Sequence, residues 1–275
     1  MKMNKKKMIF SIFLITILIV PAVHSAEVLT ITGSSTVLPV AAKCAEVFNE
    51  KQGDITVQVS GGGSGHGIEA VATGKADIGM ASREVKDSEI NKYGDKFIED
   101  TIARDGMAVV VSSKIYKKVQ NLTKEQIRMI FDGKIKNWKE VGGPDKRIFV
   151  VVRKSGSGTR DTFMEAIFGS SKAEARGKYI ETSENSEMKT AISQSDIAIG
   201  YLGLGYLGGK AVKAISVDGV SPTKETVKDG TYPIARSLYL YTWEKTSLKE
   251  GKFIDFILSE EGQNIVGEEG FVPAR

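Results

Sequence analysis

Cysteine is almost missing from this 275-residue sequence, which contains a single one, Cys44. A lone cysteine excludes an internal disulfide, so a folded core must be held together by packing alone. Counted from Ala41, the positions i+3, i+4 and i+7 are Cys44, Ala45 and Phe48, which is the spacing of one apolar helix face. We therefore expect Cys44 to be a core residue rather than a reactive thiol.

Long hydrophobic runs are also missing, with one exception at residues 8–20. Four lysines precede this run, and the small residues Val23 and Ser25 follow it. The pattern predicts a secretory signal peptide over residues 1–25 that is cut before Ala26. The run is short for a membrane span, which needs about 20 apolar residues, although an uncut anchor is the alternative. We expect a soluble exported protein in a periplasmic or other extracytoplasmic location.

A charge excess is missing once the leader is set aside. The whole chain has a formal net charge of +4. The leader holds four lysines and no acidic residue, so the mature chain has a net charge of zero. A nucleic-acid partner, which favours basic proteins, is therefore not expected. A small anion held by a few placed groups remains compatible with this composition.

Histidine is scarce too, because His24 lies in the leader and only His66 remains. Motifs with paired histidines for a metal ion are thus excluded, and no G-x-S-x-G nucleophile turn occurs. S-P-T-K at 221–224 fits S-x-x-K without the K-T-G partner. We expect His66 to be a polar residue in a first helical turn. The sequence predicts no enzyme, no metal and no cofactor.

Strand-like and helix-like segments alternate along the mature chain, which is typical of parallel βαβ units. We expect strands at 27–32, 54–60, 76–82, 104–113, 148–152, 196–203 and 233–243 and helices at 39–52, 67–75, 123–131, after the turn at 156–159, at 184–193 and at 251–267. Thr123 and Gln126 form a predicted capping box at the start of the third helix.

No flexible linker separates the two α/β regions, so we expect two Rossmann-like lobes joined by two crossing strands. The crossings are predicted near 105–111 and 232–240. Lobe I would then contain residues 26–107 and 234–275, and lobe II residues 108–233. A cleft between such lobes opens at the carboxyl ends of strands, where helix N-termini point.

Three segments have the order strand, glycine or hydroxyl turn, helix: 33–43, 60–71 and 153–163. Such turns present free N–H groups and hydroxyls to phosphate, sulfate or carboxylate. Each turn alone is also explained as an ordinary helix cap. Arg153 ends the strand before the third turn and offers a forked donor set for an oxyanion. A dinucleotide fingerprint at 65–70 is a weak alternative, because the acidic residue expected about 20 positions later is Asp87, beyond the next strand.

These turns carry a family resemblance. T-G-S-S-T-V-L-P (32–39), S-G-G-G-S-G-H-G-I-E-A-V (60–71), A-D-I-G-M-A-S-R-E-V (76–85) and V-V-R-K-S-G-S-G-T-R-D-T-F (151–163) are similar to successive segments of the phosphate-binding proteins of phosphate ABC importers, in their shorter form. The resemblance covers most of the mature chain and implies a type II periplasmic binding protein fold, a membrane permease as partner and usually a monomer. The phosphate-binding residues that it implies are Ser35, Thr36, Val37 through its N–H, Ser64, Ser82, Arg83, Arg153, Ser157, Gly158 and Thr159.

The sequence departs from the longer members of this family at two places. They have an aspartate after A-S that accepts the phosphate proton, whereas Arg83 follows Ser82 here, and Ser155 replaces the aspartate that steadies the arginine. Either another acid, with Asp161 and Glu84 as candidates, accepts the proton, or the selectivity differs. The alternatives to phosphate are sulfate, molybdate or tungstate. A secreted phosphoryl-transfer enzyme or a surface protein without ligand are further hypotheses.

Overall fold

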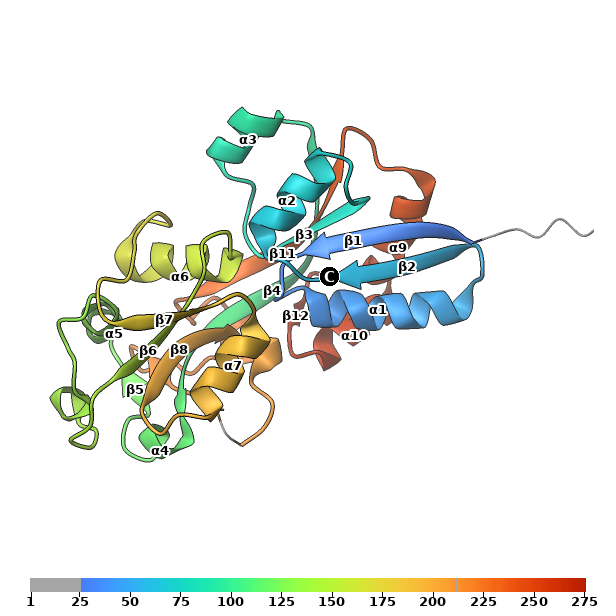
Figure 1. Ribbon diagram of the computed structural model, residues 1–275. Helices are drawn as coiled ribbons and strands as arrows, with labels where there is room; N and C mark the ends of the chain where they lie inside the picture. Colours follow the sequence, from blue (N-terminus) through green and yellow to red (C-terminus); the bar gives the residue numbers. More distant parts are fainter. Residues whose placement is uncertain (1–25, 211) are drawn as a thin grey trace, which may run out of the picture.

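The computed structural model describes residues 26–275 apart from residue 211. The predicted leader lies outside the described residues. Figure 1 shows two groups of helices on strands. We call the group that contains residues 27–93 the first half and the group that contains residues 113–228 the second half. Within the described chain, no helix combines the length and the apolar character needed to cross a membrane.

The first half begins with parallel βαβ units, as the alternation predicted. Its elements are β1 (Glu27–Gly33), α1 (Leu38–Lys51), β2 (Ile55–Ser60), α2 (Ser64–Ala72), β3 (Ile78–Ala81) and α3 (Asp87–Tyr93). Strand β1 pairs in parallel with β2 on one side and with β3 on the other. The carboxyl ends of β1 and β3 therefore lie side by side, and the turns that follow them meet at one edge of the sheet.

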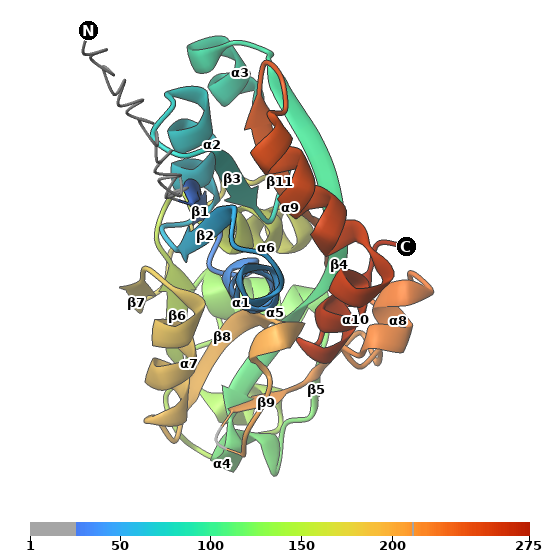
Figure 2. The ribbon, with the colours of Figure 1, turned by 90° about the vertical axis from the view of Figure 1, so that its right-hand side faces the viewer.

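Strand β4 (Phe97–Ser112) runs from the first half into the second, and Figure 2 shows it along the length of the molecule. Residues 97–106 of β4 pair antiparallel with β11 (Ala235–Trp243), which in turn pairs with β3. Residues 107–111 pair with β8 in the second half. The sequence predicted a strand only from residue 104, so it missed the polar first part of β4.

The second half repeats the strand and helix alternation. Its elements are α4 (Ser113–Tyr116), β5 (Asn121–Leu122), α5 (Lys124–Phe131), the 3-10 helix Trp138–Val141, β6 (Phe149–Arg153), α6 (Gly158–Phe168), β7 (Tyr179–Thr182), α7 (Asn185–Ser193), β8 (Ala198–Gly203), the 3-10 helix Leu204–Tyr206, β9 (Val212–Ala214), β10 (Ser216–Val217) and α8 (Lys224–Lys228). Strand β6 pairs in parallel with β7 and β8. The predicted capping box is confirmed at the start of α5, where the side chains of Thr123 and Gln126 each accept the other residue's N–H.

The predicted helix over 251–267 is wrong in one respect, because the structure has two helices there. They are α9 (Leu248–Leu258) and α10 (Glu260–Glu268), followed by β12 (Val272–Pro273). Ser259 has an extended backbone, with ψ at 166°, and its hydroxyl accepts the N–H of Gly262. A Cβ on Gly262 would lie 2.3 Å from the Phe256 carbonyl, so glycine permits the tight corner. The apolar pattern continued through this corner and hid it.

Apolar side chains form two main clusters. One gathers buried residues between 29 and 103 with others between 238 and 271, and the second gathers buried residues between 107 and 234 with Val272. Cys44 belongs to the first cluster and is fully buried, as expected. Burial raises the pKa of its thiol to about 12, which keeps it protonated and unreactive at neutral pH.

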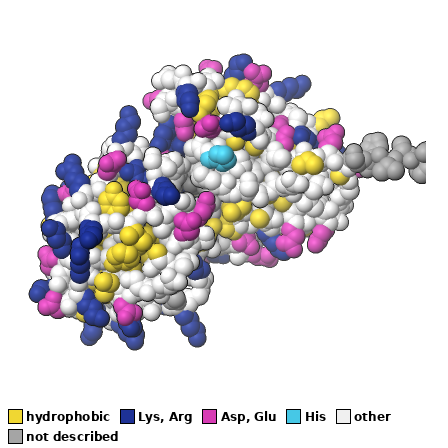
Figure 3. Space-filling model, in the orientation of Figure 1, with side chains coloured by type: hydrophobic (Ala, Val, Ile, Leu, Met, Phe, Trp, Pro, Cys, Tyr) yellow, Lys and Arg dark blue, Asp and Glu magenta, His cyan; other side chains and the backbone are white. Residues whose placement is uncertain are grey.

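Charge is distributed unevenly between the two parts of the chain. Residues 26–107 and 234–275 hold 13 Lys and Arg against 20 Asp and Glu, a formal net charge of −7. Residues 108–233 hold 21 against 14, a formal net charge of +7. Figure 3 shows Lys and Arg side chains along the outer end of the second half. Residues 26–275 are thus neutral in sum and strongly bipolar.

Candidate anion-binding site

The three turns singled out in the sequence meet where the two halves touch. The Oγ1 atoms of Thr36 and Thr159 lie 3.0 Å apart, so the first turn contacts the third. The N–H of Gly65 donates to the carbonyl of Gly156 over 3.0 Å, so the second turn contacts the third as well. Most of the hydroxyl-bearing side chains of the turns are buried, namely Ser34, Ser35, Thr36, Ser64, Ser157 and Thr159, whereas Ser60 and Ser155 are exposed. Residues up to 123 positions apart in sequence therefore share one enclosed polar site.

Gly158 allows the halves to approach this closely. It begins α6 directly after Ser157, whose hydroxyl caps the helix. A Cβ at Gly158 would lie 2.4 Å from Ser64 Oγ and 2.6 Å from Ser82 Oγ, distances that real side chains do not tolerate. The two serines come from the first half, and their hydroxyls lie 3.3 Å apart. The N-terminus of α6, with its free N–H groups, is thereby pressed against them.

Val37 differs from the sequence prediction. Its N–H, which the family resemblance assigns to phosphate, donates to the Ser34 carbonyl over 3.1 Å. The N–H of Thr36 likewise donates to Ser34 Oγ over 3.2 Å. The first turn therefore satisfies these two amides internally and offers its side-chain hydroxyls to the site. The glycine and serine residues at this turn had led us to expect free amides. The expectation was wrong because the sequence does not show how a turn folds back on itself.

Arg153 lies at the end of β6 with a side chain that is 1 % exposed. Its Nη2 donates to Ser35 Oγ over 3.2 Å and to the Ser183 carbonyl over 2.5 Å. Its Nε and Nη1 have no hydrogen-bond partner. Burial lowers the pKa of this guanidinium, although Glu184 opposes the shift from a distance, and the ion pairs among the described residues do not include Arg153. Burying a cation without a counter-charge costs free energy. An anion bound at these two nitrogens would offset that cost.

Asn185 is a site residue that the sequence analysis missed. It is fully buried at the start of α7. Its Nδ2 donates to Ser35 Oγ over 3.2 Å and to Thr36 Oγ1 over 3.0 Å, whereas its Oδ1 has no partner. A further contact reaches the same turn from Tyr206, whose hydroxyl donates to the Ser35 carbonyl over 2.6 Å. The signal available in the sequence was an asparagine at the start of a helix that follows a strand.

Arg236 and Asp105 form a buried ion pair on the strands that connect the halves, which the sequence also did not reveal. Nε and Nη2 of Arg236 lie 3.0 and 2.8 Å from Asp105 Oδ2. Arg236 also donates to Thr36 Oγ1 over 3.0 Å and to Ser82 Oγ over 3.3 Å. Burial lowers the pKa of Arg236 and raises the pKa of Asp105, while their mutual attraction opposes both effects. The pair holds two of the site hydroxyls in place.

The direction of two hydroxyl hydrogen bonds follows from these contacts. Thr36 Oγ1 accepts N–H groups from Asn185 and Arg236, and Ser35 Oγ accepts from Asn185 and Arg153. A hydroxyl oxygen has two lone pairs, so both are now occupied. The remaining O–H of each residue can only donate, and that of Thr36 has Thr159 Oγ1 as an acceptor 3.0 Å away. Together with Arg153, this lining presents hydrogen-bond donors to an anion.

Arg83 does not join the hydroxyls of the three turns. Its Nε donates to Asp161 Oδ2 over 2.9 Å, and Nη1 and Nη2 donate to the two carboxylate oxygens of Glu89 over 2.8 and 2.7 Å. Asp161 is thus occupied, and Lys86 Nζ lies 2.6 Å from the same oxygen. Glu84 is exposed. Neither Asp161 nor Glu84 faces the site hydroxyls, so the geometry favours neither of them as the acceptor of a phosphate proton.

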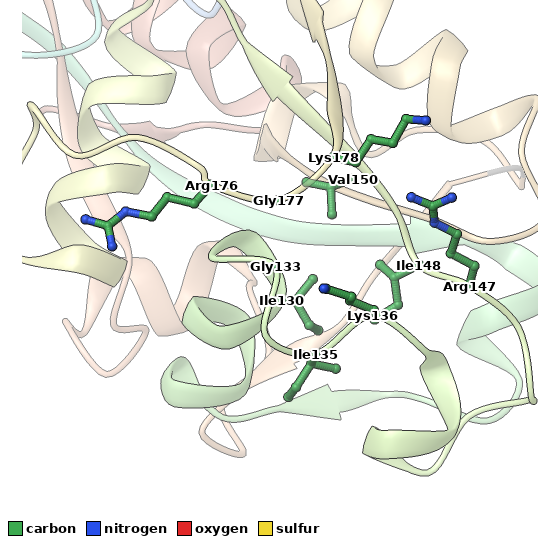
Figure 4. Close-up of a pocket in the computed structure, with 10 residues that line it drawn as sticks. All are labelled: Ile130, Gly133, Ile135, Lys136, Arg147, Ile148, Val150, Arg176, Gly177 and Lys178. Carbon is green, nitrogen blue, oxygen red and sulfur yellow. The ribbon is translucent and has the colours of Figure 1, made fainter.

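A separate pocket in the second half is not part of this site. Figure 4 shows it with four cationic residues, Lys136, Arg147, Arg176 and Lys178, around a volume of about 240 Å³. Arg176 points to one side, and Arg147 and Lys178 point to the other. Because the cationic groups diverge, they do not form a common binding point for a small anion. Elsewhere in the described chain, no group of three or more His, Cys, Asp or Glu residues is placed to hold a metal ion.

The Asp105 and Arg236 pair leads to a stability prediction. Asp105→Asn leaves Arg236 as a buried charge without a carboxylate, which costs about 3–5 kcal/mol of the free energy of unfolding. We expect a large drop in the urea midpoint at neutral pH. Asp145→Asn serves as control, since Asp145 pairs with Lys139 at the surface and should leave the midpoint unchanged. An unchanged midpoint for Asp105→Asn would contradict a structural role of the pair.

Two α/β parts that meet over a buried, unpaired guanidinium define a two-lobed binding protein for a small anion. The family model described as PBP superfamily domain matches residues 20–261. The phosphate-binding protein PstS of Bacillus subtilis (strain 168) is 36% identical over 247 residues, which cover 89% of this chain and 80% of that protein. PstS of Borreliella burgdorferi is 34% identical over 255 residues, covering 90% of each chain.

Solved structures agree with these relatives. A putative phosphate ABC transporter substrate-binding protein with bound phosphate from Clostridium perfringens has a TM-score of 0.82 and 36% identity, covering 90% of this chain and all of that one. An ABC-type phosphate transport receptor from Vibrio cholerae has a TM-score of 0.72 and 33% identity, covering 89% and 99%. The chain belongs to the PstS family of phosphate-binding proteins within the PBP superfamily. The predicted type II periplasmic binding protein fold is confirmed.

Proposed function

We propose that this protein captures inorganic phosphate between its two lobes, outside the cytoplasm, and delivers it to the membrane permease of an ABC importer. The observation that carries the proposal is Arg153, whose buried Nε and Nη1 have no partner among the surrounding turns. The names of the relatives from Bacillus subtilis and Clostridium perfringens support phosphate as the ligand and an ABC transporter as the partner. The protein is a binding component and, on this proposal, performs no catalysis.

The proposed phosphate donors come from both lobes. They are Ser35, Thr36, Ser64, Ser82, Arg153, Ser157, Gly158 and Thr159. Val37 and Arg83 are left out as direct ligands, because the N–H of Val37 and the guanidinium of Arg83 already have partners. A phosphate held by both sets of donors would itself stabilise the closed arrangement.

We keep the lobe division at 26–107 with 234–275 and at 108–233 as part of the proposal. Its support is the pair of apolar clusters, each of which draws almost all its residues from one of these two sets. Two separate cores allow each lobe to move as a unit while the cleft opens and closes. The proposed residues at the cleft lie between the clusters.

Isothermal titration of residues 26–275, stripped of endogenous anion, tests the proposal. We expect one phosphate per protein at neutral pH with a dissociation constant of about 1 µM or below. This corresponds to a favourable binding free energy of about 8 kcal/mol or more. Sulfate in large excess is expected to leave this binding in place. Absence of phosphate binding by a folded protein would overturn the proposal.

A different tetrahedral oxyanion is the second candidate, and one observation favours it. Ser35 and Thr36 are fixed as donors, and neither Asp161 nor Glu84 faces them, so the lining has few groups that can accept a ligand proton. Sulfate, molybdate and tungstate carry no such proton at neutral pH. In the same titration, displacement of phosphate by one of these anions at equal concentration would assign the site to that anion.

A further inference from the structure

An ion-pair cluster beside the site connects the two lobes. Arg83 follows β3 in the first half, and Asp161 lies in the first turn of α6 in the second half. Arg83 Nε lies 2.9 Å from Asp161 Oδ2, and Lys86 Nζ lies 2.6 Å from the same atom. Both carboxylate oxygens of Glu89 hold the far side of the Arg83 guanidinium. We call Arg83, Lys86, Glu89 and Asp161 the latch cluster.

The latch cluster lies between the two halves, so closure and opening of the cleft would make and break its contacts. Among the ion pairs of the described residues, only those of Asp161 join the set 26–107 with 234–275 to the set 108–233. The side chains of Arg83 and Asp161 are only 9% and 5% exposed. Their contact is therefore shielded from water in this arrangement, and opening of the cleft would separate and rehydrate both groups.

Each member of the central pair is prepared for this contact. Glu89 lies in the same half as Arg83 and accepts hydrogen bonds from its guanidinium through both carboxylate oxygens. The guanidinium therefore stays oriented when the halves separate. Asp161 sits at the positive end of the α6 dipole, in the same turn that presents Gly158 to the site. A bare carboxylate there would repel an incoming anion. Arg83 and Lys86 neutralise it.

We propose that Arg83 and Asp161 form a latch that makes and breaks as the lobes close and open, and that Arg83 raises ligand affinity without touching the ligand. The proposal rests on the proposed function, because it concerns closure around the same anion. It also gives Arg83 a role: the residue is a positioning group for the closed state. Loss of the latch should increase the rate of ligand release.

A charge-balanced double variant separates this role from simple electrostatics. Arg83→Met alone removes the latch and leaves Asp161 paired with Lys86 alone, so the carboxylate is neutralised less completely and we expect phosphate to bind about 100-fold more weakly. Arg83→Met with Asp161→Asn removes one charge of each sign. The latch predicts that this double variant still releases phosphate about tenfold faster than wild type in stopped-flow measurements. Wild-type release from the double variant would show that only the charge mattered and would overturn the latch.

The matched control is Lys114→Met with Asp196→Asn, an exposed pair within the second half. It removes the same charges and should leave phosphate release unchanged. The wild-type titration decides the proposed function by itself. If wild type binds no phosphate, small-angle X-ray scattering of the unliganded proteins at low salt still tests the latch. A larger radius of gyration in the double variant than in wild type and control supports the latch, and equal radii overturn it.

Discussion

Arg153→Ala is expected to abolish phosphate binding at micromolar concentrations. The wild-type guanidinium has two buried nitrogens without partners, and hydrogen bonds between charged groups each contribute about 1.5–3 kcal/mol. Loss of two such bonds amounts to about 3–6 kcal/mol, or roughly two to four orders of magnitude in the dissociation constant. Isothermal titration with phosphate measures this change directly.

Replacing Arg153 by methionine should have the opposite effect on the ligand-free protein. Removing a buried cation without a carboxylate partner relieves a desolvation cost, so unliganded Arg153→Met is expected to melt at a higher temperature than unliganded wild type. Methionine keeps most of the side-chain volume. Phosphate should then raise the melting temperature of wild type only. Arg147→Ala, which removes an exposed arginine near the start of the same strand, is the control and should change neither property.

Gly158→Ala is expected to weaken phosphate binding about tenfold to hundredfold without unfolding either lobe. The added methyl would lie 2.4 Å from Ser64 Oγ and 2.6 Å from Ser82 Oγ, so the halves cannot approach as they do here. Overpacking of this kind costs about 1–3 kcal/mol. Because the clash arises only between the halves, it opposes the closed arrangement and leaves each core intact.

Titration with phosphate and urea unfolding of the unliganded protein separate the two effects of Gly158→Ala. Gly251→Ala is the matched control. Gly251 lies in helix α9, and the nearest atom that a Cβ there would meet is Thr246 Cγ2 at 3.9 Å. It should keep wild-type affinity and gain about 0.5–1 kcal/mol of stability. If Gly158→Ala bound phosphate as tightly as wild type, the contact between α6 and the two serines would not belong to the bound state.

The sequence predicted those parts of the site that are local in the chain. Strand, turn and helix follow each other within a dozen residues at each anion turn, so glycine, serine and Arg153 could be recognised together. Asn185 reaches Thr36 across 149 positions, and Arg236 reaches it across 200. No local pattern announces such a partner, because the contact exists only after β4 and β11 bring the halves together.

Arg83 shows a different limit of sequence reasoning. Its position next to Ser82 suggested a ligand contact, whereas the structure gives it Glu89 six residues later and Asp161 on the opposite half. A basic residue beside an anion turn has no preferred partner in sequence, since an acidic side chain competes with the ligand. The corner at Ser259 was missed for a similar reason: the apolar spacing of α9 continues into α10.

The opposite net charges of −7 on residues 26–107 with 234–275 and +7 on residues 108–233 give residues 26–275, which are neutral in sum, a large electric dipole. At neutral pH such a protein should adhere weakly to both anion and cation exchangers at low salt, although its overall charge suggests neither. Near an anionic membrane surface the same dipole turns the second half toward the lipid within about a Debye length, roughly 8 Å at physiological salt. The protein would then meet a membrane partner in a preferred orientation instead of tumbling freely.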